Sequence, residues 1–204
     1  MNKRSKDTRF QVPNTYGDSA NIDKKIEKMN LLNAIQVYKS SDYERLFNMR
    51  NYYKKRSLEI AIRDAAAGKN PDGSMNSHQW RVGKKKGDEG GQELVKYFDE
   101  IQSCQSFEDI FQITEKVKNK IWRLGDLWSY DVALRIGFNR NLFPSKVYVQ
   151  RGVIAGVKKA LNGIRPRGRC IPLAAFPKEL QQLEPYEVEN FLCIWGKDKG
   201  KKYC

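Results

Sequence analysis

The sequence is poor in the residues from which metal and disulfide sites are built. It has one histidine, His78, and its four cysteines form no Cys-x-x-Cys pair. A structural zinc site needs paired ligands that converge from short turns, so we expect no metal and no other cofactor. Without such pairs the cysteines are expected to be reduced, mostly buried thiols. That expectation favours the cytoplasm or another reducing intracellular compartment.

Long hydrophobic runs are also missing. No apolar stretch approaches ~18 residues, and the first 14 residues are charged and polar, so we expect neither a membrane-spanning helix nor a signal peptide. The chain of 204 residues is 40% hydrophobic and 11% aromatic, which is enough to form the core of one domain, or of one domain with an appendage. These features exclude a membrane protein, a small secreted disulfide protein and a wholly disordered chain.

Carboxylates are absent from one long segment. The formal net charge is +14, and residues 132–178 contain ten Lys and Arg residues and no Asp or Glu. Residues 88–131, just before, contain ten acidic and five basic residues. A long block of one sign raises a positive potential that attracts phosphate. It favours a nucleic acid or a phosphorylated ligand as partner over a generally basic surface.

The hydrophobic spacing predicts helices along most of the chain. Ser41 with Glu44, and Ser106 with Asp109, match helix N-terminal caps, Gly68 would end a helix, and Pro185 would begin the last one. We expect a loop over residues 69–91 and one short strand over 146–149. The predicted organisation is a basic flexible arm (1–17), N-terminal helices (18–68), a helical domain (69–196) and a basic tail (197–204).

The sequence from Ile121 to Gly137 predicts a helix pair joined by a tight turn at Gly125, with the second helix over Leu127–Ile136. This segment resembles the helix-hairpin-helix element of DNA-binding and base-excision-repair proteins. In that element, glycine lets backbone N–H groups at a helix start approach a DNA phosphate. The resemblance covers roughly residues 88–165, and Lys146-Val147-Tyr148-Val149 occupies the place of the Val-Asp-Thr-His segment of the glycosylase branch. It implies a mainly α fold, with a helix-hairpin-helix element and basic mobile termini.

The departures from that family limit what the resemblance implies. Arg123 stands where the hairpin has its first glycine, and Tyr148 stands where the glycosylases have their catalytic aspartate. A tyrosine cannot supply the carboxylate that stabilises an oxocarbenium-like transition state, and the turn has no lysine to act as a Schiff-base nucleophile. The resemblance therefore does not imply classical glycosylase chemistry.

Two further segments carry candidate contacts. The segment from Asn76 to Arg81 combines His78, an amide, Trp80 and a guanidinium, a set that suits base stacking or phosphate binding, although we expect Trp80 to be tucked into the core. Three arginines alternate with helix-breaking residues over 163–169, and their planar forks suit phosphate. The expected phosphate-binding set is His78, Arg81, Arg123, Gly125, Arg135, Arg140, Lys146, Arg151, Lys158, Lys159, Arg165, Arg167 and Arg169.

The sequence thus predicts a nucleic-acid-binding protein that contacts the phosphate backbone, of DNA rather than RNA. One alternative is a glycosylase- or lyase-like enzyme, or another nucleotide-processing enzyme, with His78, Asp131 and Tyr148 as candidate catalytic residues. A second alternative is a protein that sequesters a small phosphorylated ligand, or a basic subunit of a larger assembly. Oligomeric state is left open, as is whether residues 1–57 pack on the rest.

Overall fold

The computed structural model describes residue 26 and residues 29–196. The predicted arm over 1–17 and tail over 197–204 lie outside these residues, as do residues 18–25, 27 and 28 of the predicted N-terminal helices. Within the described part no helix is long and apolar enough to cross a membrane.

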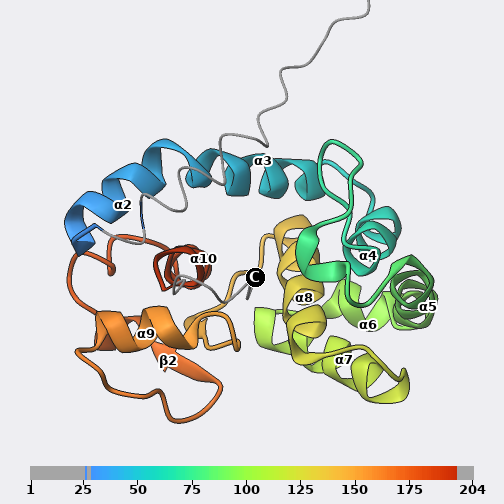
Figure 1. Ribbon diagram of the computed structural model, residues 1–204. Helices are drawn as coiled ribbons and strands as arrows, with labels where there is room; N and C mark the ends of the chain where they lie inside the picture. The colour runs from blue at the N-terminus through green and yellow to red at the C-terminus, as the bar shows by residue number, and fades with distance from the viewer. Residues whose placement is uncertain (1–25, 27–28, 197–204) are drawn as a thin grey trace, which may run out of the picture.

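The described part of the chain is mainly α, as predicted, with one two-stranded sheet (Figure 1). The helices are α2 (Leu31–Ser40), α3 (Asp42–Lys54), α4 (Leu58–Ala66), α5 (Lys84–Val95), α6 (Phe98–Ser103), α7 (Phe107–Lys120), α8 (Asp126–Arg140), α9 (Ile154–Ala160) and α10 (Pro185–Trp195). Two short 3-10 helices are η1 (Ser77–Gln79) and η2 (Leu173–Ala175). Strand β1 (Lys146–Tyr148) pairs antiparallel with β2 (Cys170–Pro172), with Val147 opposite Ile171.

Two hydrophobic cores organise these elements. The first core lies among α4 to α8 and includes Trp128, Tyr130 and Phe138. The second core lies among α2, α9, α10 and the two strands, and includes Tyr38 and Phe191. Figure 1 shows these groups on opposite sides of the molecule, with α3 running along one edge between α2 and α4. Residues on both sides of position 68 contribute to both cores, so the described N-terminal helices pack on the rest.

Strand β1 is shared by the two cores. Successive side chains of a strand point to opposite faces. Val147 accordingly packs in the second core and Tyr148 in the first. The side chain of Tyr186, on α10, also reaches the first core, where its ring lies 5.5 Å from that of Phe138.

Helix α5 corrects the prediction of a loop over residues 69–91, because its first residue is Lys84. Its glycines serve close packing instead of a turn. A Cβ at Gly87 would lie 2.8 Å from the carbonyl oxygen of Ala66, and one at Gly90 would lie 2.6 Å from Cζ2 of Trp128. The indole N–H of Trp128 donates to the same Ala66 oxygen at 3.1 Å. These contacts between segments far apart in the sequence hold α4, α5 and α8 together.

The predicted helix ends had mixed outcomes. Ser106 and Asp109 form a reciprocal capping box at the start of α7, and Pro185 begins α10. Gly68 ends the α4 region with a φ of +67°. The Ser41 cap was wrong, because its hydroxyl donates to the Val37 carbonyl and makes no capping bond to α3.

One expectation about a side chain was also wrong. Trp80 is 69% exposed instead of buried, with its indole N–H donating to the Met75 carbonyl at 3.2 Å. Among the described residues, Cys104 and Cys170 are free thiols, as expected.

Candidate functional site

The turn between α7 and α8 is anchored at its ends and exposed at its tip. The Leu124 N–H donates to the Ile121 carbonyl at 3.3 Å, and both of these side chains are buried. Between them Trp122 and Arg123 point to solvent, and the Trp122 side chain is 80% exposed. Arg123 has a φ of +77°, a backbone conformation that favours glycine. Arg123, where the predicted resemblance would put a glycine, thus has a glycine-like backbone conformation.

Gly125 immediately precedes α8 as its N-cap. Its φ of −108° is accessible to any residue, and a Cβ added there would meet no atom within 4 Å. Neither backbone conformation nor packing therefore requires glycine at this position. Gly125 has no side chain with which to cap the first turn of α8, and within the described residues Lys118 and Arg169 both lie at the Asp126 carboxylate of that turn.

Four charged side chains join this turn to the loop before β2. The Arg169 guanidinium lies 2.8 Å from the Glu115 carboxylate and 3.1 Å from that of Asp126. Lys118 lies 2.7 Å from Asp126 and 3.0 Å from Glu115. The hydroxyl of Ser129 also donates to Glu115. This network, which we call the hairpin ion cluster, fixes the arginine loop (residues 163–169) against the start of α8.

The hairpin ion cluster changes the pKa of each member. Burial raises the pKa of Glu115, but hydrogen bonds from Ser129, Lys118 and Arg169 outweigh it, so the net shift is downward. The hydrogen bond from Lys118 lowers the pKa of Asp126. The pKa of Arg169 is raised, chiefly by its hydrogen bond to Glu115. All members are therefore charged at neutral pH, and Arg169 is already engaged by two carboxylates.

Most of the other predicted phosphate contacts are exposed. Lys146 lies on β1, Arg151 and Lys158 lie before and on α9, and Arg165 and Arg167 lie in the arginine loop. Arg81, near Trp80, is exposed as well. Lys159 is exposed, and its ammonium group sits 4.0 Å from the centre of the Trp195 ring.

Arg135 and Arg140 do not fit the predicted role. Arg135 is only 3% exposed and lies 4.0 Å from Asp131, its neighbour one helical turn away. Arg140 donates to the Gln102 carbonyl at 2.6 Å. Arg135 cannot reach an external phosphate backbone, and Arg140 is tied to the last turn of α6.

Arg135 belongs instead to an inner polar cluster, made of Gln79, Tyr130, Asp131, Arg135 and Glu189. The Gln79 amide donates to Asp131 at 3.2 Å, which places η1, the element that contains His78, against α8. Gln79 Oε1, the Tyr130 hydroxyl and Arg135 Nε make no hydrogen bond within the described structure, although all three side chains are buried. Burial, with a smaller effect of Asp131, raises the pKa of Glu189 well above its usual range.

Tyr148 is buried among aromatic rings near this cluster. Its ring lies 5.4 Å from that of Phe107 and 5.3 Å from that of Tyr130. Burial raises the pKa of Tyr148 to about 12. Tyr148 therefore packs as a neutral core residue at the position where a glycosylase would need a carboxylate.

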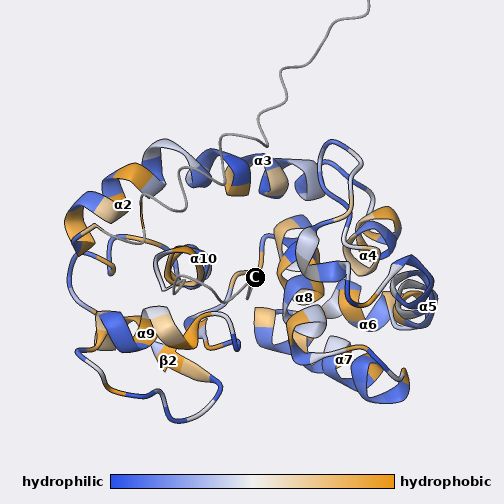
Figure 2. Ribbon diagram, in the orientation of Figure 1, coloured by the Kyte–Doolittle hydropathy of each residue, from blue (hydrophilic) through white to orange (hydrophobic). Residues whose placement is uncertain are grey.

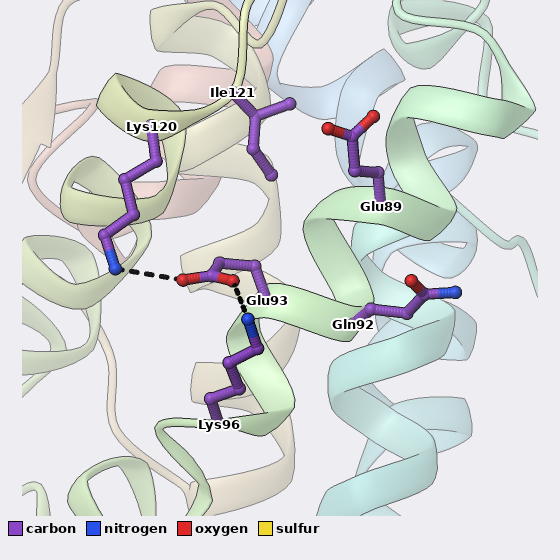
Figure 3. Close-up of a pocket in the computed structure, with 6 residues that line it drawn as sticks. All are labelled: Glu89, Gln92, Glu93, Lys96, Lys120 and Ile121. Atoms are coloured by element: carbon purple, nitrogen blue, oxygen red, sulfur yellow. Dashed lines mark hydrogen bonds and ion pairs between the residues drawn. The ribbon is translucent and has the colours of Figure 1, made fainter.

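A surface pocket of about 370 Å³ lies beside the turn, between α5 and the end of α7 (Figure 3). Its charges pair with one another. Glu93 accepts hydrogen bonds from Lys96 at 2.5 Å and from Lys120 at 2.9 Å, and these bonds lower its pKa. Figure 2 shows α7 as largely hydrophilic, in keeping with these paired surface charges. With both lysines engaged, the pocket offers little to an external anion.

The structure brings some predicted regions together and separates others. Gly125 and the arginine loop are neighbours through Asp126 and Arg169. The η1 helix contacts α8 further along, at Asp131. Sequence reasoning missed Glu115 and Lys118, whose spacing of three residues on a helix was the available signal. It also left Trp122 out of the candidate set.

Comparison with known proteins adds no relative. No protein-family model, no curated protein and no solved structure matches this chain. The fold class therefore rests on the helices and cores described above, and the helix-hairpin-helix resemblance remains a prediction.

Proposed function

We propose that this protein binds nucleic acid through its phosphate backbone, at the α7–α8 turn and along the arginine loop. The observation that carries the proposal is the contact of Arg169 with Asp126 at 3.1 Å. It ties the segment that contains the exposed Arg165 and Arg167 to Asp126, the first residue of α8. A helix start with free backbone donors, flanked by arginines, is a favourable place for a phosphate.

Three further points support this proposal. Lys146, Lys158, Arg165 and Arg167 are exposed and make no ion pair with any described residue. Gly125 leaves room for a phosphate where the fold does not need a glycine. The turn joins two helices, as in the helix-hairpin-helix element, which favours DNA over RNA. Tyr148 makes classical glycosylase chemistry the less favoured reading.

The salt dependence of binding tests the proposal. Each phosphate contact contributes about 0.9 to the slope of log affinity against log salt on duplex DNA. Measured by fluorescence anisotropy between about 50 and 200 mM salt, wild-type affinity should fall steeply. Arg165→Gln and Arg167→Gln should each reduce the slope by about 1.

The matched control is Lys84→Gln. Lys84 is exposed but lies 2.6 Å from Asp88 on α5, so its loss removes the same charge away from the proposed interface. Its slope should equal that of wild type. Affinity that does not change with salt, or an equal effect of all three variants, would rule the interface out.

The inner polar cluster favours a second candidate, an enzyme acting on a base or nucleotide. A carboxyl whose pKa is raised by burial and by another carboxylate is a common arrangement for general acid–base catalysis, and Glu189, whose pKa is raised by burial and to a smaller extent by Asp131, fits it. Glu189→Gln and Asp131→Asn should then keep DNA binding but lose product formation, followed by gel electrophoresis. If wild-type protein leaves bound DNA unchanged, this candidate is excluded for that substrate.

A further inference from the structure

We infer that Trp122 is a stacking platform for an unpaired base, so that the protein prefers single-stranded DNA over duplex. This inference rests on the proposed function, because the same turn would hold the flanking phosphate. Trp122 and Arg123 occupy the two central positions of the turn closed by the bond between Leu124 N–H and the Ile121 carbonyl. The central residues of such a turn project away from the helices that it joins.

Trp122 and Arg123, at the tip of the turn, each cost folding free energy, yet both ends of the turn are fixed in the core. Trp122 leaves 80% of its surface in water, although a large aromatic side chain gains free energy when buried. A positive φ at an arginine costs free energy, and such strain clusters at functional sites. The buried side chains of Ile121 and Leu124 fix both ends of the turn. The indole of Trp122 is therefore exposed on a turn whose two ends are fixed.

Charge makes a nucleic acid the matching occupant. The Arg123 guanidinium lies 5.5 Å from the centre of the Trp122 ring, close enough for a cation–π contact that holds the indole. A base that stacks on the free face of the indole would bring its phosphate toward this guanidinium. An apolar protein partner would instead have to desolvate that charge.

An unpaired base is the ligand that best fits an exposed indole beside a guanidinium. Every base offers a π-face, so stacking on tryptophan needs no base-edge contact and no sequence preference. Inserting an indole into an intact duplex would require unstacking a base step, whereas an unpaired base is already free. The inference is therefore a preference for single-stranded segments.

The test compares two DNA probes of one sequence, one single-stranded and one duplex, by fluorescence anisotropy. Trp122→Ala should weaken single-strand binding by roughly tenfold or more, since loss of one stacking contact has this size. Duplex affinity should change by less than about twofold. Trp122→Phe, which keeps an aromatic face, should restore most of the single-strand affinity. Phe47→Ala is the control, because Phe47 is also an exposed aromatic residue but lies on α3, outside the turn.

Arg123→Gly separates this role from a structural one. Glycine relieves the positive φ, so the melting temperature should hold or rise while affinity for both probes falls. An unchanged affinity in Trp122→Ala, or an equal loss on both probes, overturns the stacking role and leaves the phosphate interface standing. If wild-type protein binds neither probe in a salt-dependent way, the proposed function fails as well.

Discussion

Arg169 reaches across from the loop before β2 to Asp126, the first residue of α8, with its guanidinium 3.1 Å from the carboxylate. The same arginine lies 2.8 Å from Glu115 on α7. The most basic segment of the chain is thus attached to the acidic segment that precedes it. A phosphate bound at the start of α8 would compete with the Asp126 carboxylate for Arg169 and Lys118.

That competition predicts the effect of removing the carboxylate. Asp126→Asn should increase affinity for DNA by about two- to fivefold at low salt, the range of one exposed ionic interaction. The cause is that Arg169 and Lys118 become available to phosphate. Asp88→Asn removes the same charge on α5 and should have little effect. Equal gains in both variants would mean that only net charge matters.

Gly125→Ser should weaken DNA binding without destabilising the fold. The φ and ψ of Gly125, −108° and 175°, suit a serine N-cap, whose hydroxyl would accept from the first N–H groups of α8. The melting temperature should therefore hold or rise. The new side chain would occupy the proposed phosphate position, so affinity should fall severalfold. Wild-type affinity in this variant would place the phosphate elsewhere.

Gly90→Ala should destabilise the fold, because its Cβ would lie 2.6 Å from the buried Trp128 ring. Overpacking of this kind costs about 1–3 kcal/mol, more than the gain from alanine in a helix. Chemical denaturation followed by circular dichroism would measure the difference. A variant as stable as wild type would show that α5 does not pack on α8 through its glycines.

The hairpin ion cluster predicts a stability that is lost in acid. The folded pKa of Glu115 is below its ordinary value of 4.5, so its contribution is complete above that pH and disappears as pH falls through the folded value. Glu115→Gln should therefore melt lower than wild type at pH 7, and the gap should close below about pH 4.5.

Thermal melts monitored by circular dichroism at a series of pH values would measure this gap. Glu44→Gln is the control, because Glu44 is exposed on α3 and makes no ion pair with a described residue. Its small difference from wild type should not depend on pH. A gap for Glu115→Gln that stays constant down to pH 3 would contradict the assignment.

Local sequence patterns predicted the elements whose signals are local. Ser106, Pro185 and the spacing after Gly125 each specify a helix start through neighbouring residues alone, and α7, α10 and α8 begin near them. Helix α5 was missed because its glycines resemble a loop. These glycines are needed because Trp128 and Ala66 pack closely against α5, and that contact exists only in the folded chain.

The candidate site shows the same difference between local sequence signals and contacts that form only on folding. The acid-free segment identified the exposed Arg165 and Arg167, but counting charge along the chain could not show that Arg169 is paired with carboxylates of another segment. Arg135 is buried because it lies seven residues from Trp128 and four from Asp131, on the helical face that packs inward. That spacing was visible in the sequence, whereas the partners on that face were not.

Val147 and Tyr148 are adjacent in the chain, yet one packs in each hydrophobic core. Disorder in either core would displace strand β1, against which the other core also packs. The two halves of the molecule should therefore melt together in one cooperative transition. A substitution in either half would then shift the same midpoint, and a cut between α8 and β1 would divide the second core itself, with α2 on one side and α9 and α10 on the other.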